Sequence, residues 1–138
     1  MNGKFWISGI VVTVLYFLLG WLFYGILMAS TFMTAGTPGM RAEPLYGVIF
    51  LATLAYGFLM AYTFPIGYKG GTAGSEGMRF GILFALIIKL PSGLFMMAFS
   101  EGYTVKALVI GLIWEIIVGA VLGVITAKIY GSAAKAKA

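Results

Sequence analysis

The stretch that decides the fold is residues 77–127, GMRFGILFALIIKLPSGLFMMAFSEGYTVKALVIGLIWEIIVGAVLGVITA. Every fourth residue of its first half is small or charged: Gly77, Gly81, Ala85, Lys89 and Gly93. The second half repeats the pattern with Gly111, Glu115, Gly119, Gly123 and Ala127. Four-residue spacing keeps side chains on one slowly drifting face of a helix. The pattern therefore predicts two helices, each with a groove of small residues that is interrupted by one charge.

The two patterns mirror each other about Gly102. Lys89 and Glu115 each lie thirteen residues from that glycine, so a chain that folds back there places the charges opposite one another. Counted from Phe80 and from Thr104 at about 1.5 Å per residue, they lie roughly 13–14 Å and roughly 16 Å deep, near the middle of a hydrocarbon core of ~30 Å. Small residues let two membrane helices approach closely. We expect an antiparallel hairpin with a mid-membrane ion pair.

The role of this pair stays open at the level of sequence. An isolated charge at the bilayer centre costs about 2.5–3.5 kcal/mol on insertion scales, so such residues are usually partnered. The pair could be structural and fix the helix register. It could instead serve coupling, with Glu115 changing protonation beside Lys89 as a standing counter-charge, or either residue could pair with another subunit. Pro91 is expected to kink the helix and to free the carbonyl of Ile87.

Composition places the whole chain in a membrane. It is 62% hydrophobic and only 9% charged, whereas soluble domains carry about 25% charged residues. Four apolar runs, at about 5–28, 45–66, 77–100 and 104–130, are each near or above the ~20 residues that span a bilayer. Long continuous runs favour helices over barrel strands. We expect one transmembrane domain, an all-α integral membrane four-helix bundle, followed by a basic tail at 131–138.

The residue types needed for most catalytic and metal sites are missing. The chain has no Cys, His or Asp, which removes thiol chemistry and the commonest ligands of zinc, copper and iron–sulfur sites. The predicted loops are also too short to form a domain outside the membrane. We expect no metal, no cofactor, no catalytic residue and no enzyme activity.

The basic residues indicate how the spans are oriented. Cytoplasmic loops of membrane proteins carry an excess of Lys and Arg. With four spans, one side holds Lys4, Lys69, Arg79, Lys128, Lys135 and Lys137, and the other holds Arg41 and Lys106. The bias predicts that both termini are cytoplasmic, in a bacterial inner membrane. Because these residues are scattered near span ends, the net charge of +5 does not indicate nucleic-acid binding.

The first span is rich in aromatic residues. Tyr16, Trp21 and Tyr24 lie close to Gly20 and Gly25. Helix packing, in which the glycines admit bulky side chains from a neighbour, is one interpretation. The other is a pocket in which the three aromatic side chains contact a ligand or partner.

Several features of residues 77–130 resemble small bacterial four-helix integral membrane proteins of uncharacterised function. They are the Gly-spaced third span, Lys89-Leu90-Pro91, Trp114-Glu115 with Gly119 and Gly123, and Ile129-Tyr130. The resemblance implies a fold and no activity. Small multidrug transporters are similar in size and helix number, but their essential glutamate lies in the first span, where this chain has none.

Two classes of function follow from these observations. The first is a non-catalytic membrane subunit or scaffold that contacts lipid and associates with itself as a homo-oligomer or with other membrane subunits. The alternative is a small oligomeric ion- or proton-coupled transporter or channel that uses Lys89 and Glu115. The spans contain few other polar residues, which makes a continuous hydrophilic pathway hard to build.

Overall fold

The computed structural model describes residues 2–32 and 43–131, and all regular structure in them is helical. The elements are α1 (Gly3–Gly20), the π-helix η1 (Trp21–Leu27), α2 (Ala29–Phe32), α3 (Tyr46–Gly67), α4 (Ala73–Phe99) and α5 (Val105–Tyr130). Four helices, Gly3–Leu27, Tyr46–Gly67, Ala73–Phe99 and Val105–Tyr130, are long and apolar enough to cross a membrane. The predicted all-α four-helix fold is confirmed, as expected for an integral membrane protein.

The helix boundaries follow local capping. α4 begins at Ala73, four residues before the predicted start, because Thr72 caps it and accepts a hydrogen bond from the Ser75 amide at 3.3 Å. α5 begins in the same way after Thr104, whose hydroxyl oxygen accepts from the Ala107 amide at 3.2 Å. Such caps satisfy amides that the first helical turn leaves without a partner. Residues 33–42, with Arg41, and 132–138, most of the predicted basic tail, lie outside the described residues.

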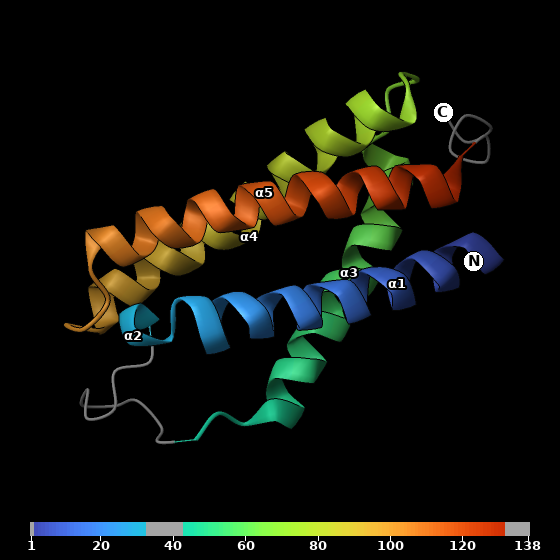
Figure 1. Ribbon diagram of the computed structural model, residues 1–138. Coiled ribbons are helices and arrows are strands. Elements are labelled where there is room, and N and C mark those ends of the chain that lie inside the picture. Colours follow the sequence, from blue (N-terminus) through green and yellow to red (C-terminus); the bar gives the residue numbers. More distant parts are fainter. Residues whose placement is uncertain (1, 33–42, 132–138) are drawn as a thin grey trace.

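The predicted antiparallel hairpin of α4 and α5 is confirmed (Figure 1), and small residues bring its backbones into contact. A Cβ atom added to Gly119 would lie 2.5 Å from the carbonyl oxygen of Gly81 and 2.7 Å from the Cβ of Ala85. A Cβ atom on Gly77 would lie 2.5 Å from the carbonyl oxygen of Gly123. No side chain fits at these positions, so the two helices pack backbone against backbone.

One end of each stripe turns away from this contact. Ala127 is buried in a cluster with Ala61, Phe64, Tyr68 and Tyr130, and so packs toward α3. A Cβ atom on Gly93 would meet the side chain of Leu108 rather than backbone. The physical reason is that every fourth residue drifts around a helix of 3.6 residues per turn. The closest approach therefore joins Gly77 and Gly81 of α4 to Gly119 and Gly123 of α5.

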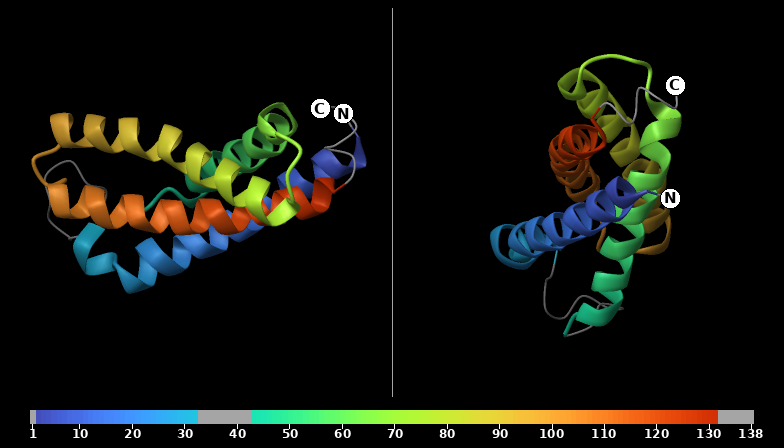
Figure 2. Two further views of the ribbon diagram at one scale, coloured as in Figure 1. Left: turned by 90° about the horizontal axis from the view of Figure 1, so that it is seen from above. Right: turned by 90° about the vertical axis from the view of Figure 1, so that its right-hand side faces the viewer.

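α1 and α3 complete the bundle. α3 crosses α1 steeply (Figures 1 and 2), and the crossing point is marked by glycines. A Cβ atom on Gly9 would lie 2.7 Å from the ring of Phe58, and one on Gly57 would lie 2.7 Å from the carbonyl oxygen of Gly9. α1 also packs along α5, where the Lys4 ammonium donates to the Tyr130 carbonyl at 2.9 Å. Because the crossing is steep, the first half of α3 diverges from the second half of the first span.

That second half of the first span is a π-helix, where the sequence predicts a continuous α-helix. In η1 the Met28 amide donates to the carbonyl of Phe23, five residues earlier, at 2.7 Å. A π-helical turn changes the angular position of the side chains that follow it, and such turns are frequent at functional sites. Here the turn seats Phe23 on Trp114 of α5 with ring centroids 4.1 Å apart.

Candidate functional site

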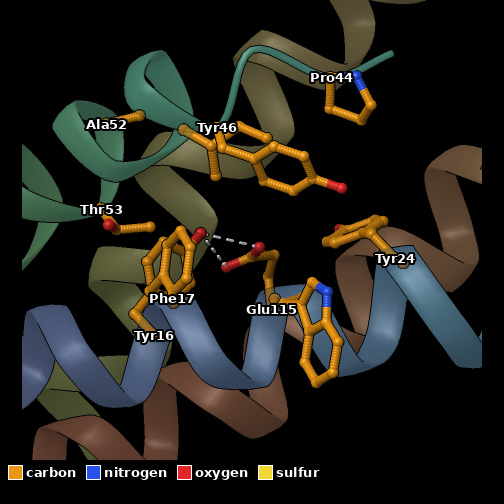
Figure 3. Close-up of a pocket in the computed structure, with 12 residues that line it drawn as sticks. Tyr16, Phe17, Tyr24, Pro44, Tyr46, Ala52, Thr53 and Glu115 are labelled. Carbon is orange, nitrogen blue, oxygen red and sulfur yellow. Dashed lines mark hydrogen bonds between the residues drawn. The ribbon is translucent and has the colours of Figure 1, made fainter. Parts of the chain in front are cut away.

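A cavity of about 430 Å³ lies where α1 and η1 diverge from α3 (Figure 3). Small-molecule sites typically have volumes of ≈ 300–1,000 Å³ and apolar walls with few polar groups. This wall is largely aromatic and aliphatic, with one carboxylate from α5. The lining residues are Tyr16, Phe17, Gly20, Trp21, Tyr24, Gly25, Pro44, Tyr46, Ile49, Ala52, Thr53 and Glu115.

Glu115 supplies the carboxylate. It is only 4% exposed, and its side chain points from α5 toward Tyr16, below the ring of Tyr46 (Figure 3). The Tyr16 hydroxyl donates to both carboxylate oxygens, at 3.0 and 3.2 Å. The Tyr16 ring stacks on Tyr56, with centroids 3.9 Å apart and planes 16° from parallel. A stacked ring thus fixes the hydroxyl that orients the buried carboxylate.

Lys89 lies beside the cavity and does not line it. Its ammonium donates to the Tyr24 hydroxyl at 3.1 Å and sits 5.3 Å from the centre of the Tyr24 ring. Gly111 makes room for it, because a Cβ atom there would lie 3.0 Å from Lys89 Cε and 3.4 Å from its Nζ. Tyr24 therefore stands between the lysine and the open space.

The structure differs from the expected direct ion pair between Lys89 and Glu115. Within residues 2–32 and 43–131, the salt bridge joins Arg79 to Glu76 at 2.8 Å, and the two mid-span charges form none with each other. One physical reason is the register of the hairpin, which sets Lys89 against Gly111, one helical turn or ~5.4 Å along α5 from Glu115. The other is the first span, which offers the Tyr16 hydroxyl to Glu115 and the Tyr24 hydroxyl to Lys89. The charges share one layer of the bundle without touching.

The three aromatic residues singled out in the first span, Tyr16, Trp21 and Tyr24, all line the cavity. Tyr16 also packs in the core cluster of Val12 and Met60. Among the described residues, Gly20 and Gly25 do not admit a side chain from a neighbouring helix, because nothing lies within 4 Å of a Cβ atom added to Gly20 and only Trp21 does so at Gly25. Pro91 plays no part in the cavity. α4 continues through it to Phe99, and Lys89 bonds to Tyr24 rather than to a freed carbonyl.

The α3 side of the cavity is not predicted by the sequence. Tyr46 had the signature of an interface anchor, and Ile49, Ala52 and Thr53 resemble any lipid-facing span. No local pattern indicates that α3 crosses α1 at a steep angle, and that crossing alone brings these residues to the cavity.

The structure also buries the Tyr56 hydroxyl without a hydrogen-bond partner among the described residues.

The cavity presents one carboxylate to a largely apolar wall. In the part of the chain that the structure describes, no three His, Cys, Asp or Glu side chains gather as metal ligands would. One buried carboxylate held by a phenol, beside apolar walls, is suited to holding a molecule with a hydrogen-bond donor or a charge. No protein-family model, no curated protein and no solved structure matches this chain, so the geometry of the cavity carries the functional argument.

Proposed function

We propose that this chain is a non-catalytic integral membrane protein that holds a small, largely apolar molecule in the cavity between α1, η1 and α3. The observation that carries the proposal is the buried Glu115 carboxylate facing a space of about 430 Å³ with aromatic walls. A purely structural charge would be packed on all sides or paired with its nearest opposite charge. Glu115 instead has open volume on one side and bonds to Tyr16 on the other.

Binding can be tested with a bromine-bearing apolar probe, because bromine quenches tryptophan fluorescence on contact. Trp21 lines the cavity, and its contribution is the difference in emission between the wild type and Trp21→Phe. 4-Bromoanisole added to the protein in lipid nanodiscs should quench this emission saturably. Quenching that rises linearly, as expected for a probe dissolved in lipid, contradicts the proposal.

A matched pair of variants on α3 provides the control. Ala52 lines the cavity, whereas Ala55, one turn away and also exposed, does not. Ala52→Phe should fill the space and abolish the saturable quenching. Ala55→Phe adds the same ring outside the cavity and should leave it intact. Equal behaviour of the two variants would place the probe elsewhere.

The membrane and the topology belong to the same proposal: a bacterial inner membrane with both termini cytoplasmic. The described basic residues support it, because Lys4, Lys69, Arg79 and Lys128 lie at the end of the bundle where α1 starts and α5 finishes, against Lys106 at the other end. Cytoplasmic enrichment of such residues is general. As the chain has no cysteine, single replacements can be labelled from either side. Gly74→Cys should react only from the cytoplasm, and Glu101→Cys only from outside.

The chain is further proposed to act as a subunit, associating with copies of itself or with a larger membrane complex. Large apolar side chains exposed along α4, such as Ile87, Leu94, Phe95 and Phe99, support contact with lipid or with neighbouring helices. A subunit should be recovered from native membranes at fixed stoichiometry with its partners. Recovery as a monomer alone would count against this part of the proposal.

A second candidate function is transport coupled to an ion or proton. The observation in its favour is that Glu115 and Lys89 each bond to a phenol rather than to one another. A carboxylate that is not locked in an ion pair can exchange a proton or a cation more readily. Flux through reconstituted vesicles that disappears in Glu115→Gln, with folding unchanged, would support coupling.

A further inference from the structure

We infer that the cavity takes a neutral molecule with an apolar body and a hydroxyl head group that donates to Glu115, and that Lys89 makes the site reject organic cations. This inference rests on the proposed function, since it names the class of molecule that the same cavity would hold. It follows from the charge around the cavity, the free lone pairs of the carboxylate and the nature of the wall.

Charge is the first step. An aromatic cavity with one carboxylate would by itself favour an organic cation, through the carboxylate and through the ring faces. Here, however, Lys89 packs on Gly111, one turn from Glu115, and already balances its charge. A second cation would leave the layer with a net positive charge in hydrocarbon, where an uncompensated charge is strongly disfavoured. The balanced site therefore favours an uncharged occupant.

Hydrogen bonding is the second step. An ionised carboxylate offers about four lone-pair directions. The Tyr16 hydroxyl carries a single proton, which it shares between the two oxygens at 3.0 and 3.2 Å. The carboxylate thus retains acceptor capacity on the side that faces the open volume (Figure 3). A hydroxyl donor from a bound molecule would use it, and a charge-assisted bond of this kind is stronger than a neutral one.

The wall is the third step. The rings of Phe17, Trp21 and Tyr46 line the cavity together with Ile49 of α3. The described lining contains no charged side chain other than Glu115. Such a wall suits an apolar body, and Tyr24 separates that body from the lysine ammonium. Lys89 thus acts on the occupant through its charge alone.

The test compares probes that share a bromophenyl body and differ only in the head group. 4-Bromophenol is a neutral donor, 4-bromoanisole is neutral without a donor, and (4-bromophenyl)trimethylammonium is a permanent cation. Dissociation constants come from saturable quenching of Trp21 in nanodiscs at pH 7. We expect the phenol to bind about tenfold more tightly than the anisole, as one charge-assisted hydrogen bond predicts. The cation should bind no more tightly than the anisole.

Two residues supply the decisive variants. Lys89→Met removes the balancing charge, so the cation should bind at least tenfold more tightly than to the wild type, whereas Lys89→Arg should keep the wild-type preference. Glu115→Gln should remove most of the advantage of phenol over anisole, because a neutral amide oxygen is a weaker acceptor. Should Lys89→Met fail to fold, the comparison of the cation with the anisole on the wild type still tests the balancing charge, and Glu115→Gln still tests the acceptor.

Each outcome has one meaning. If the cation binds best to the wild type, or if Lys89→Met does not raise its affinity, the role given to Lys89 is wrong. If phenol and anisole bind equally, Glu115 does not recognise a donor, although saturable anisole binding would still support the proposed function. If no probe gives saturable quenching, the proposed function fails as well. 4-Bromocyclohexanol separates two supporting cases: weaker binding than the phenol indicates an aromatic alcohol, and equal binding an aliphatic one.

Discussion

Replacing Gly119 by alanine should separate the backbones of α4 and α5 and destabilise the fold. The added Cβ atom would lie 2.5 Å from the Gly81 carbonyl oxygen and 2.7 Å from the Ala85 Cβ, whereas ordinary contacts begin at 3.4 Å. The helices must therefore move apart by roughly 1 Å, because a carbonyl in the middle of a helix cannot rotate away. Overpacking of this kind costs about 1–3 kcal/mol.

The control isolates this packing cost from helix propensity. Alanine is preferred over glycine in a helix by up to ~1 kcal/mol, which partly offsets the clash. Gly47, in the first turn of α3, has nothing within 4 Å of an added Cβ atom, so Gly47→Ala should show at most the propensity gain and no clash. We expect Gly119→Ala to be less stable than Gly47→Ala by about 1–3 kcal/mol.

The measurement is equilibrium unfolding in mixed micelles with increasing SDS, followed by far-ultraviolet circular dichroism. Ala85→Gly in the Gly119→Ala background removes one of the two clashing groups and should restore part of the loss. It should not restore all of it, because the Gly81 carbonyl remains in place. Equal stability of Gly119→Ala and Gly47→Ala would refute the backbone contact between α4 and α5.

Three further predictions concern single hydrogen bonds. Tyr130→Phe removes the buried bond from the Tyr130 hydroxyl to the Ala61 carbonyl and should cost about 0.5–1.5 kcal/mol in the same unfolding assay; an unchanged midpoint would contradict it. Thr72→Ala removes the N-cap of α4 and should cost ~1 kcal/mol, seen as faster amide exchange of Ser75, while unaltered exchange would show that the cap is dispensable. Tyr16→Phe leaves the Glu115 carboxylate without its donor, and a double-mutant cycle with Glu115→Gln should give a coupling of about 1.5–3 kcal/mol; additive effects would exclude the bond.

The sequence was a good guide wherever neighbours along the chain decide the contact. α4 and α5 are joined by a short turn, so the position of each residue on one helix fixes which residue it can face on the other. Small residues at a spacing of four then allow close approach along one line. The helices, the hairpin and the contact of Gly81 with Gly123 could be read from residues 77–127. The shift in register that sets Gly81 against Gly119 and Lys89 against Gly111 could not.

The partners of the two mid-span charges and the cavity itself were decided by tertiary structure. The mirrored spacing about Gly102 brings Lys89 and Glu115 to one layer of the hairpin. It does not predict which side chains a third helix places in the same layer. Tyr16 reaches this layer from α1 and Tyr24 from the π-helical turn that follows, and the steep crossing of α3 over α1 leaves open volume beside them. A charge in hydrocarbon bonds to the donors and acceptors that lie near it. Which groups lie near it depends on the angles between helices, and these angles are set only when all the helices pack together.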